Sequence, residues 1–479
     1  MNISKFRNNN RMKKLIVTAI AVFLMSTVTA QVNESTAKAV GQTFLNSKGS
    51  KSELKLAYSN SEYFIFNGET GFVIVSASNN VTPILGYSTE GNFDVTNLPP
   101  AVTEILQGYS KEIAYIISEQ IEVKQVQVQW ENLSNGIAPK VQKSSTVEPL
   151  IQTQWGQGDQ TNYKWYNDSC PYDQTAGRNV LVGCNAVTMA QIMKYWNYPS
   201  TGTGERSYYH EYAYNGTTYN YGTLSVNFGS TTYNWSSMPN KLTASNPAVA
   251  QILYHCGVAI NMKYSPNFSG AWGFIGSVDN LDEVGNPKID VRTALQRYFG
   301  YAEGIYQIEK KDFTETEWIS AIKTELDKRQ PINYGSSSHS YICDGYDEND
   351  MFHLNFGWTG SCNGYFHTSS IIPTQGTWNQ NHTNGQYAIM GIKPKNWTSI
   401  AETKNENNVK VYPNPTSGEL KIKNEELREG TVIEIFNIVG QNVGAYPCGR
   451  PETTIDISHL ANGMYYLRIW EKVVKFVKE

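Results

Sequence analysis

The sequence predicts an α+β protein whose three folded segments follow a leader. The first segment, residues 31–147, combines helical patterns with alternating strands. The second, residues 148–397, places four helical patterns before a run of strands and turns. This order is typical of an α+β domain with a helical half and an antiparallel sheet half. The third, residues 398–479, holds only short alternating strands, which predicts a small β-sandwich.

The composition excludes some classes of protein. The chain has 479 residues, of which 40% are hydrophobic, so it can bury more than one core. Its net charge is −4 and its pI is near 6.1, whereas nucleic-acid binders carry a basic face, so we expect no nucleic-acid partner. The 31 tyrosines and 11 tryptophans, with only 17% charged residues, suit an extracellular β-rich protein.

The first 30 residues have the pattern of an export signal. Basic residues at positions 5, 7, 11, 13 and 14 precede the apolar run LIVTAIAVFLMSTV, and the small residues Thr29 and Ala30 follow it. This pattern is typical of a removable signal peptide. A membrane anchor is the alternative, but the apolar run is short for a bilayer span. We expect a signal peptide at 1–30 and a secreted or cell-surface protein.

Local patterns order the elements within the segments. In the first segment we expect a helix at 33–48, strands at 54–59, 63–68 and 71–78, and an amphipathic helix at 102–121. The polar stretch 132–149 indicates an exposed linker that is easily cut. In the second segment we expect helices at 184–197, 247–261, 289–299 and 315–328, and a β-hairpin within the tyrosine-rich stretch 207–235.

Six cysteines stand at positions 170, 184, 256, 343, 362 and 448. Their spacing shows no CxxC pair, so we expect neither a zinc site nor a redox dithiol. The acidic turn at 344–350 lacks the spacing and the glutamate of a calcium loop. We therefore expect neither a metal nor an organic cofactor.

The stretch VGCNAVTMAQIMKYW, residues 182–196, predicts a helix with a cysteine at its start. Apolar side chains recur along one helical face, at positions 186, 189, 190 and 193, and Gly183 permits a sharp entry. Cys184 then lies in the first turn, where unpaired N–H groups and the helix dipole favour a thiolate and lower its pKa. A packed core thiol and half of a disulfide are the alternatives to a nucleophile.

A nucleophilic cysteine needs a base, usually a histidine that a third group orients. His339 precedes the strand HSYICDGY, and the turn DEND returns the chain along MFHLNFGW. This hairpin would bring residues 355–358 back toward His339, so that Asn355 could hold the imidazole as in Cys-His-Asn proteases. A register slip of one residue would turn Phe356 toward His339 instead. His353 is the rival base, although its apolar neighbours favour a core position.

Acyl transfer also needs donors for an oxyanion. The backbone N–H of Cys184 can supply one, and an amide side chain can supply another. The stretch TQWGQGDQ offers Gln154, Gln157 and Gln160. Gln157 stands between two glycines and can approach closely, so we favour it over the other two.

These motifs resemble one known family. The stretches GCNAVTMAQIMKYW with YPSTGTG, HSYICDGYDENDMFHLNFGWTGSCNGYF, and WGQG upstream are similar in order and spacing to the streptopain-type cysteine proteases, over most of residues 150–395. The resemblance implies a papain-like fold, with Cys184 as nucleophile, His339 as base and Gln157 as oxyanion donor. Phe356 stands where that family commonly has a tryptophan against the histidine. We expect Phe356 and Trp358 to supply aromatic support near the histidine.

The flanking segments resemble parts of the same kind of precursor. Residues 50–115, with GFVIVSASNNVTPILGYSTEGNF, are similar to the inhibitory pro-segment of that family. The motifs YPNPTSG, IFNIVGQNV and DISHLANGMYYLRI resemble the C-terminal sorting domain of type IX secretion. The resemblance implies an exported zymogen that its own pro-segment inhibits. Its other partners would be protein or peptide substrates and the outer-membrane secretion machinery.

We therefore expect a secreted cysteine endopeptidase, made as a zymogen, that forms an acyl-enzyme through a Cys-His thiolate. Two alternatives stay open. One is an amidase or transpeptidase that uses the same Cys-His pair. The other is a catalytically inactive secreted adhesin or inhibitor, for which the tyrosine-rich stretch would be a binding surface.

Overall fold

The computed structural model describes residues 32–139, 146–158, 165–275, 280–336, 339–368, 370–371, 385–397 and 409–479, the last range apart from 424–426, 429, 438–440, 449, 451 and 471. The expected signal peptide lies outside these ranges. The chain forms two compact units, Met1–Asn396 and Trp397–Glu479. Within the described ranges, no helix has both the length and the apolar character needed to cross a bilayer.

The first part of the larger unit contains the helices and strands that the sequence predicts. Helix α2 (Glu34–Ser47) and helix α3 (Pro100–Ser118) come before and after the three predicted strands, β1 (Lys55–Ser59), β2 (Tyr63–Asn67) and β3 (Phe72–Ser76). A fourth strand, β4 (Ile84–Ser88), was not predicted. The α2 helix begins where the Asn33 side chain accepts from the N–H of Thr36. The predicted linker is shorter than expected, because helix α4 (Lys124–Ser134) enters it and Val147 already pairs with Tyr346.

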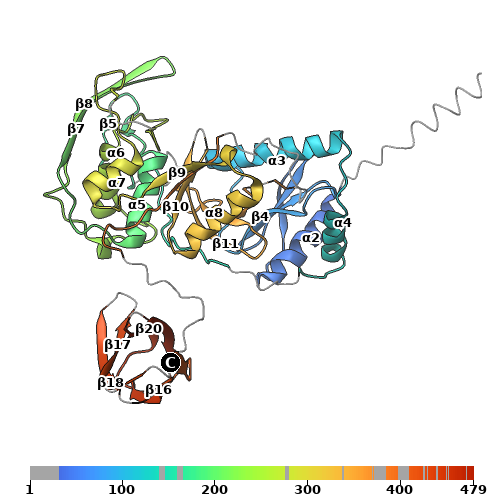
Figure 1. The fold of residues 1–479 in the computed structure, drawn as a ribbon. Helices are drawn as coiled ribbons and strands as arrows, with labels where there is room; N and C mark the ends of the chain where they lie inside the picture. Colours follow the sequence, from blue (N-terminus) through green and yellow to red (C-terminus); the bar gives the residue numbers. More distant parts are fainter. Residues whose placement is uncertain are drawn as a thin grey trace, which may run out of the picture. The chain divides into compact units, whose positions relative to one another are not determined.

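The second part begins with the helical half. Its helices are α5 (Cys184–Trp196), α6 (Pro247–Ala259) and α7 (Val291–Phe299), and α8 (Glu315–Asp327) packs against the sheet half. Both ends of each of these four helices lie within two residues of the predicted positions. The tyrosine-rich stretch forms the expected hairpin, β7 (Glu205–Tyr214) and β8 (Thr217–Asn227), which borders the helical half (Figure 1). The second part also contains four short elements: β5 (Tyr172–Asp173), β6 (Arg178–Asn179), η1 (Trp235–Ser237) and η2 (Lys310–Asp312).

One antiparallel sheet joins the two parts of this unit, in the order β1-β2-β3-β4-β13-β12-β11-β10-β14-β9 (Figure 1). The strands of the second part are β9 (Tyr306–Glu309), β10 (Ile332–Gly335), β11 (Ser340–Tyr346), β12 (Phe352–Asn355), β13 (Gly364–Phe366) and β14 (Tyr387–Met390). At the junction of β4 and β13, Tyr87 faces Tyr365 and Gly86 faces Phe366. A Cβ on residue 86 would lie 2.9 Å from the Phe366 ring, so the pairing requires glycine there.

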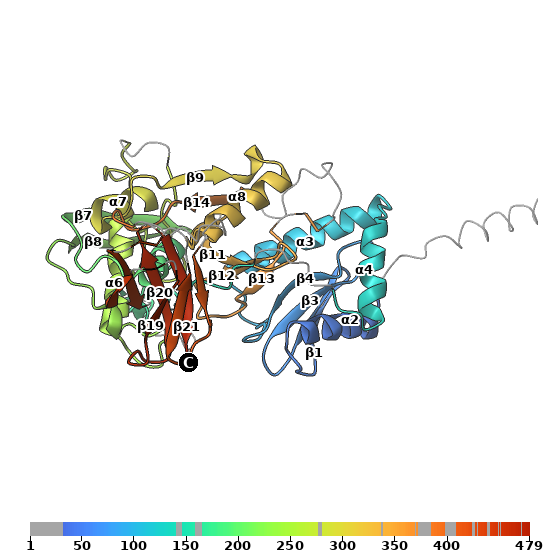
Figure 2. The same ribbon diagram turned by 60° about the horizontal axis from the view of Figure 1, so that its bottom comes forward.

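Two hydrophobic cores meet at strand β11. Tyr341 and Cys343 belong to a core that includes side chains of α2, α3, α4 and α8, whereas Ile342 belongs to the core of the helical half. Successive side chains of a strand point to opposite faces, which explains this alternation. Helix α3 runs along the sheet junction in both views (Figures 1 and 2), where the Tyr109 hydroxyl lies 2.8 Å from the carbonyl of His367. The first part therefore shares both a sheet and a core with the second.

The C-terminal unit has the predicted β-sandwich. Its strands are β15 (Lys410–Tyr412), β16 (Glu419–Lys423), β17 (Thr431–Asn437), β18 (Asn442–Cys448), β19 (Glu452–Asp456), β20 (Gly463–Ile469) and β21 (Lys472–Lys478). They form two sheets, β15-β16-β19 and β18-β17-β20-β21. Leu420, Ile435 and Leu467 lie in a core of its own.

Candidate active site

Helix α5 begins at Cys184, as the sequence predicts. Gly183 turns the chain into the helix with φ of 91°, a conformation that favours glycine. A Cβ on residue 183 would lie 2.5 Å from the sulfur of Met262 and 3.2 Å from the carbonyl of Ser269. Both backbone geometry and space therefore require glycine before the thiol.

The thiol of Cys184 is half-buried and free, so it is not half of a disulfide. Burial raises its pKa, while the backbone N–H groups of Ser340, Asn185 and Cys184 lower it, and the net shift is upward. The expectation of a lowered pKa is therefore wrong for this state of the protein. The first turn does supply N–H groups, but the loss of solvation outweighs them.

His339 lies at the tight connection between β10 and β11. Its carbonyl accepts from the N–H of Ser336, and Gly335 pairs with Ser340 across the hairpin. Burial lowers the pKa of His339, and the carboxylate of Glu104 raises it. Glu104 belongs to helix α3 and also accepts from the Ser336 hydroxyl at 2.5 Å. An acid of the first part thus holds the loop that carries the histidine.

Cys184 contacts the same hairpin at the residue that follows His339. Its thiol interacts with the backbone N–H of Ser340, the residue that follows His339. The fold therefore brings together two segments that are more than 150 residues apart in the sequence, the start of α5 and the start of β11. The sequence predicts that these two segments meet; the contact of the thiol with the imidazole of His339 stays a prediction.

Asn355 lies at the end of β12, opposite Ile342 and not opposite His339. Its amide donates to the carbonyl of Thr153 at 2.8 Å, and its oxygen accepts from the N–H of Gly357 at 3.1 Å and from Gln191 at 3.4 Å. In this state of the protein, the side chain ties helix α5 to the segment near residue 153. The proposed contact with the imidazole is not among these bonds.

The two aromatic residues after Asn355 differ in their surroundings. Phe356 is buried, and its ring centroid lies 5.5 Å from those of both Tyr341 and Phe366. It therefore packs in the core shared with the first part. Trp358 is half-buried, and its indole N–H is buried without an acceptor among the described residues. Whether either ring supports His339 stays a prediction.

Gln157 lies beside the entry to helix α5, because its carbonyl accepts from the N–H of Val182 at 3.0 Å. Gly158 follows with φ of 80°, and a Cβ there would lie 2.2 Å from the side chain of Asn167. Gln154 is held elsewhere, since its N–H donates to the carbonyl of Asn240. Gln160 lies outside the described residues. A backbone bond thus holds Gln157 beside Val182, which stands two residues before Cys184.

His353, the rival base, has a structural partner. Its Nδ1 lies 2.6 Å from a carboxylate oxygen of Asp344, which is fully buried, and its ring packs edge-on against Tyr365. The other oxygen of Asp344 accepts from the N–H of Ile151 at 2.7 Å. The Nδ1 of His353 has the partner that was expected, but the side chain is 13% exposed and so lies at the edge of the core.

Tyr387 is a neighbour of the thiol that the sequence did not indicate. It lies on β14 and pairs with Gly335, where a Cβ would meet the tyrosine ring at 2.6 Å. Burial raises its pKa, and so does the nearby thiol of Cys184. No local pattern could have found this residue, since β14 reaches the site only through the order of strands in the sheet.

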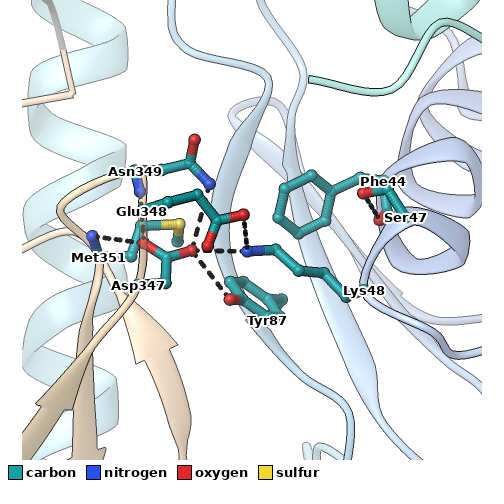
Figure 3. Close-up of polar contacts among 8 residues, drawn as sticks. All are labelled: Phe44, Ser47, Lys48, Tyr87, Asp347, Glu348, Asn349 and Met351. Carbon is teal, nitrogen blue, oxygen red and sulfur yellow. Dashed lines mark hydrogen bonds and ion pairs between the residues drawn. The ribbon is translucent and has the colours of Figure 1, made fainter. Parts of the chain in front are cut away.

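A second contact between the two parts centres on Asp347, in the turn between β11 and β12 (Figure 3). The ammonium of Lys48, just after α2, lies 2.9 Å from Asp347 and 2.8 Å from Glu348, and the Tyr87 hydroxyl donates to Asp347 at 2.9 Å. The N–H of Met351 also donates to Asp347. Burial alone would raise the pKa of Asp347, but Lys48 and the backbone N–H groups of Met351 and Asn349 hold it below its usual value.

Three parts of the chain match known families. Residues 155–366 match the Peptidase C10 family, residues 29–113 match the Spi protease inhibitor, and residues 410–479 match the secretion system C-terminal sorting domain. The three matches follow the order of the segments that the sequence predicts.

Individual proteins are similar over longer stretches. The chain is 28% identical over 406 residues to the thiol protease/hemagglutinin PrtT of Porphyromonas gingivalis, which is 79% of this chain but only 43% of PrtT. It is 28% identical over 356 residues to streptopain of Streptococcus pyogenes, which is 70% of this chain and 82% of streptopain.

A solved structure gives the same picture of the larger unit. A fragment of prointerpain A of Prevotella intermedia superposes with a TM-score of 0.55 and 26% identity, covering 72% of this chain and 99% of the fragment. The geometry around Cys184, the shared sheet and the three matches point the same way. The chain therefore carries a Peptidase C10 domain, with an inhibitor-type pro-segment before it and a secretion system C-terminal sorting domain after it, the order of parts expected for a cysteine protease precursor.

Proposed function

We propose that the mature enzyme hydrolyses peptide bonds of protein substrates with Cys184 as nucleophile and His339 as base. The imidazole takes the thiol proton, and the sulfur attacks the peptide carbonyl carbon. The N–H of Cys184 and the amide of Gln157 stabilise the oxyanion. The imidazolium then protonates the leaving amine, and water, activated by the same imidazole, hydrolyses the thioester. The observation that carries this proposal is the thiol at the start of α5 beside the backbone of Ser340, within a Peptidase C10 domain.

We further propose that the precursor is inactive because residues 31–147 bind the chain at both ends of strand β11, which follows His339. Glu104 binds the loop of His339, and Lys48 binds the turn at Asp347. A half-buried thiol whose pKa is raised, with the loop of the histidine held by a carboxylate, is a poor nucleophile. Cleavage in the linker between Ser134 and Val147 would separate the pro-segment from the protease, residues 148–397. The signal peptide at 1–30 and the sorting domain at 398–479 would direct export through the outer-membrane secretion machinery.

A thiol-directed covalent reagent tests the assignment. We expect a peptidyl vinyl sulfone to label the mature protease at Cys184 alone, because the other four cysteines of residues 148–397 are buried in the precursor. Peptide mapping by mass spectrometry identifies the labelled position, and the uncut precursor should react at least about tenfold more slowly. Labelling of another cysteine in the folded mature enzyme, with Cys184 unmodified, would refute the proposal.

The two alternatives give different products. An amidase or transpeptidase would pass the acyl group to an added amine in preference to water, which mass spectrometry of the products reveals. An inactive adhesin would keep its binding after Cys184→Ala and would hydrolyse no peptide. Hydrolysis that is lost with Cys184 supports the protease.

Docking of the pro-segment should weaken as the pH rises, because of Glu112 on α3. This carboxyl is buried against the second part, where it accepts from the Ser370 hydroxyl and the N–H of Ile371. Burial raises its pKa to about 8, although those two bonds lower it. A carboxyl with a raised pKa stabilises the docked state fully below its ordinary pKa, and that stability is lost as the pH rises toward about 8.

We expect release of the pro-segment from linker-cut precursor to become about tenfold faster between pH 6 and pH 8.5, measured by gel filtration. The variant Glu112→Gln keeps the shape and the acceptor but cannot ionise, so its release should lose most of this dependence. Equal pH profiles for the two proteins would contradict the role of Glu112.

A further inference from the structure

Helix α5 carries a polar stripe below the thiol. Cys184, Thr188 and Gln191 are spaced by four and three residues, so they lie on one face of the helix. The Thr188 hydroxyl lies 3.4 Å from that of Ser340, which in turn donates to Asn333 at 2.6 Å. The side chains of this group are at most 4% exposed: Thr188, Gln191, Asn333 and Ser340. The thiol helix therefore meets the sheet half through a buried polar seam.

Gln191 is the centre of this seam. It is fully buried, and its side-chain oxygen accepts from the Thr153 hydroxyl at 2.9 Å and from the N–H of Trp155 at 3.1 Å. Its amide nitrogen donates to the oxygen of Asn355 at 3.4 Å. Asn355 returns to the same segment by donating to the carbonyl of Thr153. One side chain thus connects α5, strand β12 and the segment 153–157.

The third of these elements carries the proposed oxyanion donor. Trp155 stands two residues before Gln157, and its N–H is fixed by Gln191 while its carbonyl accepts from the N–H of Thr359 at 3.2 Å. Gln157 itself is held by Val182, just before the helix. The position of Gln157 relative to Cys184 is therefore fixed by two restraints. One is the bond to Val182, before the thiol in the chain, and the other is the bond from Trp155 to Gln191, after it.

We propose that Gln191 is a positioning residue that aligns the oxyanion donor and strand β12 with the nucleophile; this inference rests on the proposed function. A buried polar group without its partners is costly, so the network permits one register of α5 against its neighbours. An apolar seam would bury the same area but would tolerate sliding. A displacement of about 1 Å near reacting atoms can reduce the rate about 100-fold, so a fixed register matters for the chemistry.

The test compares two variants of the mature enzyme. Gln191→Met keeps the volume and removes all three bonds, so we expect kcat to fall about 30- to 100-fold with KM changed less than about threefold. Binding of a peptide aldehyde, which forms a tetrahedral adduct with an oxyanion, should weaken in parallel. Alkylation of Cys184 by iodoacetamide, which needs no oxyanion donor, should stay within about twofold of wild type.

The variant Gln191→Glu should recover activity when its carboxyl is protonated. A protonated glutamic acid can accept from Thr153 and Trp155 and donate to Asn355, whereas the ionised form faces the oxygen of Asn355. We expect kcat of this variant, relative to wild type, to recover as the pH falls, and Gln191→Met to show no such recovery. Gln251→Met on helix α6, where the glutamine is half-buried, is the control and should retain wild-type kinetics.

The outcomes separate the two proposals. If Gln191→Met keeps kcat within threefold, or if alkylation and aldehyde binding fall together, Gln191 is not a positioning residue. Should that variant fail to fold, Thr153→Val removes one donor at nearly constant volume and should give a smaller loss of kcat in the same direction. A mature wild type that neither hydrolyses peptides nor reacts at Cys184 would refute the proposed function itself.

Discussion

Replacing Cys184 with alanine should reduce peptide hydrolysis by the mature enzyme about 10⁴-fold or more, because no other group on α5 can form the acyl-enzyme. Asn185 and Thr188, its neighbours on the helix, are buried and carry no thiol. Since the variant cannot mature by its own activity, both proteins should be trimmed with the same added protease. Initial rates on a fluorogenic peptide then measure the effect.

His339→Ala should cause a loss of similar size, and the double variant should lose little more than either single one, because the two groups act as a unit. Cys362→Ala is the matched control, a thiol that is 1% exposed and whose pKa burial raises to about 11. We expect it to keep its activity per folded molecule. Substantial hydrolysis by folded Cys184→Ala would exclude the mechanism.

Replacing Lys48 with methionine should weaken the hold of the pro-segment about 100-fold. Lys48 and Asp347 are 12% and 5% exposed, so the substitution leaves a buried carboxylate without its counter-ion. Loss of one partner of a buried pair costs about 3–5 kcal/mol, and some solvent access reduces this to about 3 kcal/mol, the equivalent of about 100-fold. The methionine keeps the packing on Phe44 (Figure 3).

The precursor is cut in the linker and then diluted, and the peptidase activity that appears as the pro-segment dissociates is measured. The wild-type complex should stay inhibited to concentrations about 100-fold lower than those at which the Lys48→Met complex becomes active. Lys38→Met is the control, since the pair of Lys38 with Glu53 is exposed and lies within the pro-segment. Equal inhibition of all three complexes would show that the contact at Asp347 does not hold the pro-segment.

Much of the chain follows from local sequence. The helix at 184–196 and the glycine before its cysteine are determined by neighbours along the chain, so the position of Cys184 in the first turn could be predicted. The hairpin of β11 and β12 follows from the turn at 347–350, and alternating residues predict the strands of the pro-segment and the sandwich. His353 has apolar neighbours, which indicated a core position.

The long-range contacts around the candidate site could not be found in this way. The register of β12 places Asn355 against Thr153 and Gln191, and a strand pattern does not reveal register. The upward pKa shift of Cys184 depends on burial, a sum over segments that are distant in sequence. The sequence around Cys184 indicates only the effect of the helix dipole, which favours the thiolate.

From the sequence alone, most of the helices and strands and a set of candidate residues for the chemistry could be predicted, because turn conformation, capping and periodicity act over a few residues. Only the tertiary structure decided that β4 pairs with β13 and that Glu104 reaches the loop of His339. It also decided that Lys48 meets Asp347, 299 positions away. Such contacts depend on how complete surfaces fit together, so no short stretch of the chain encodes them.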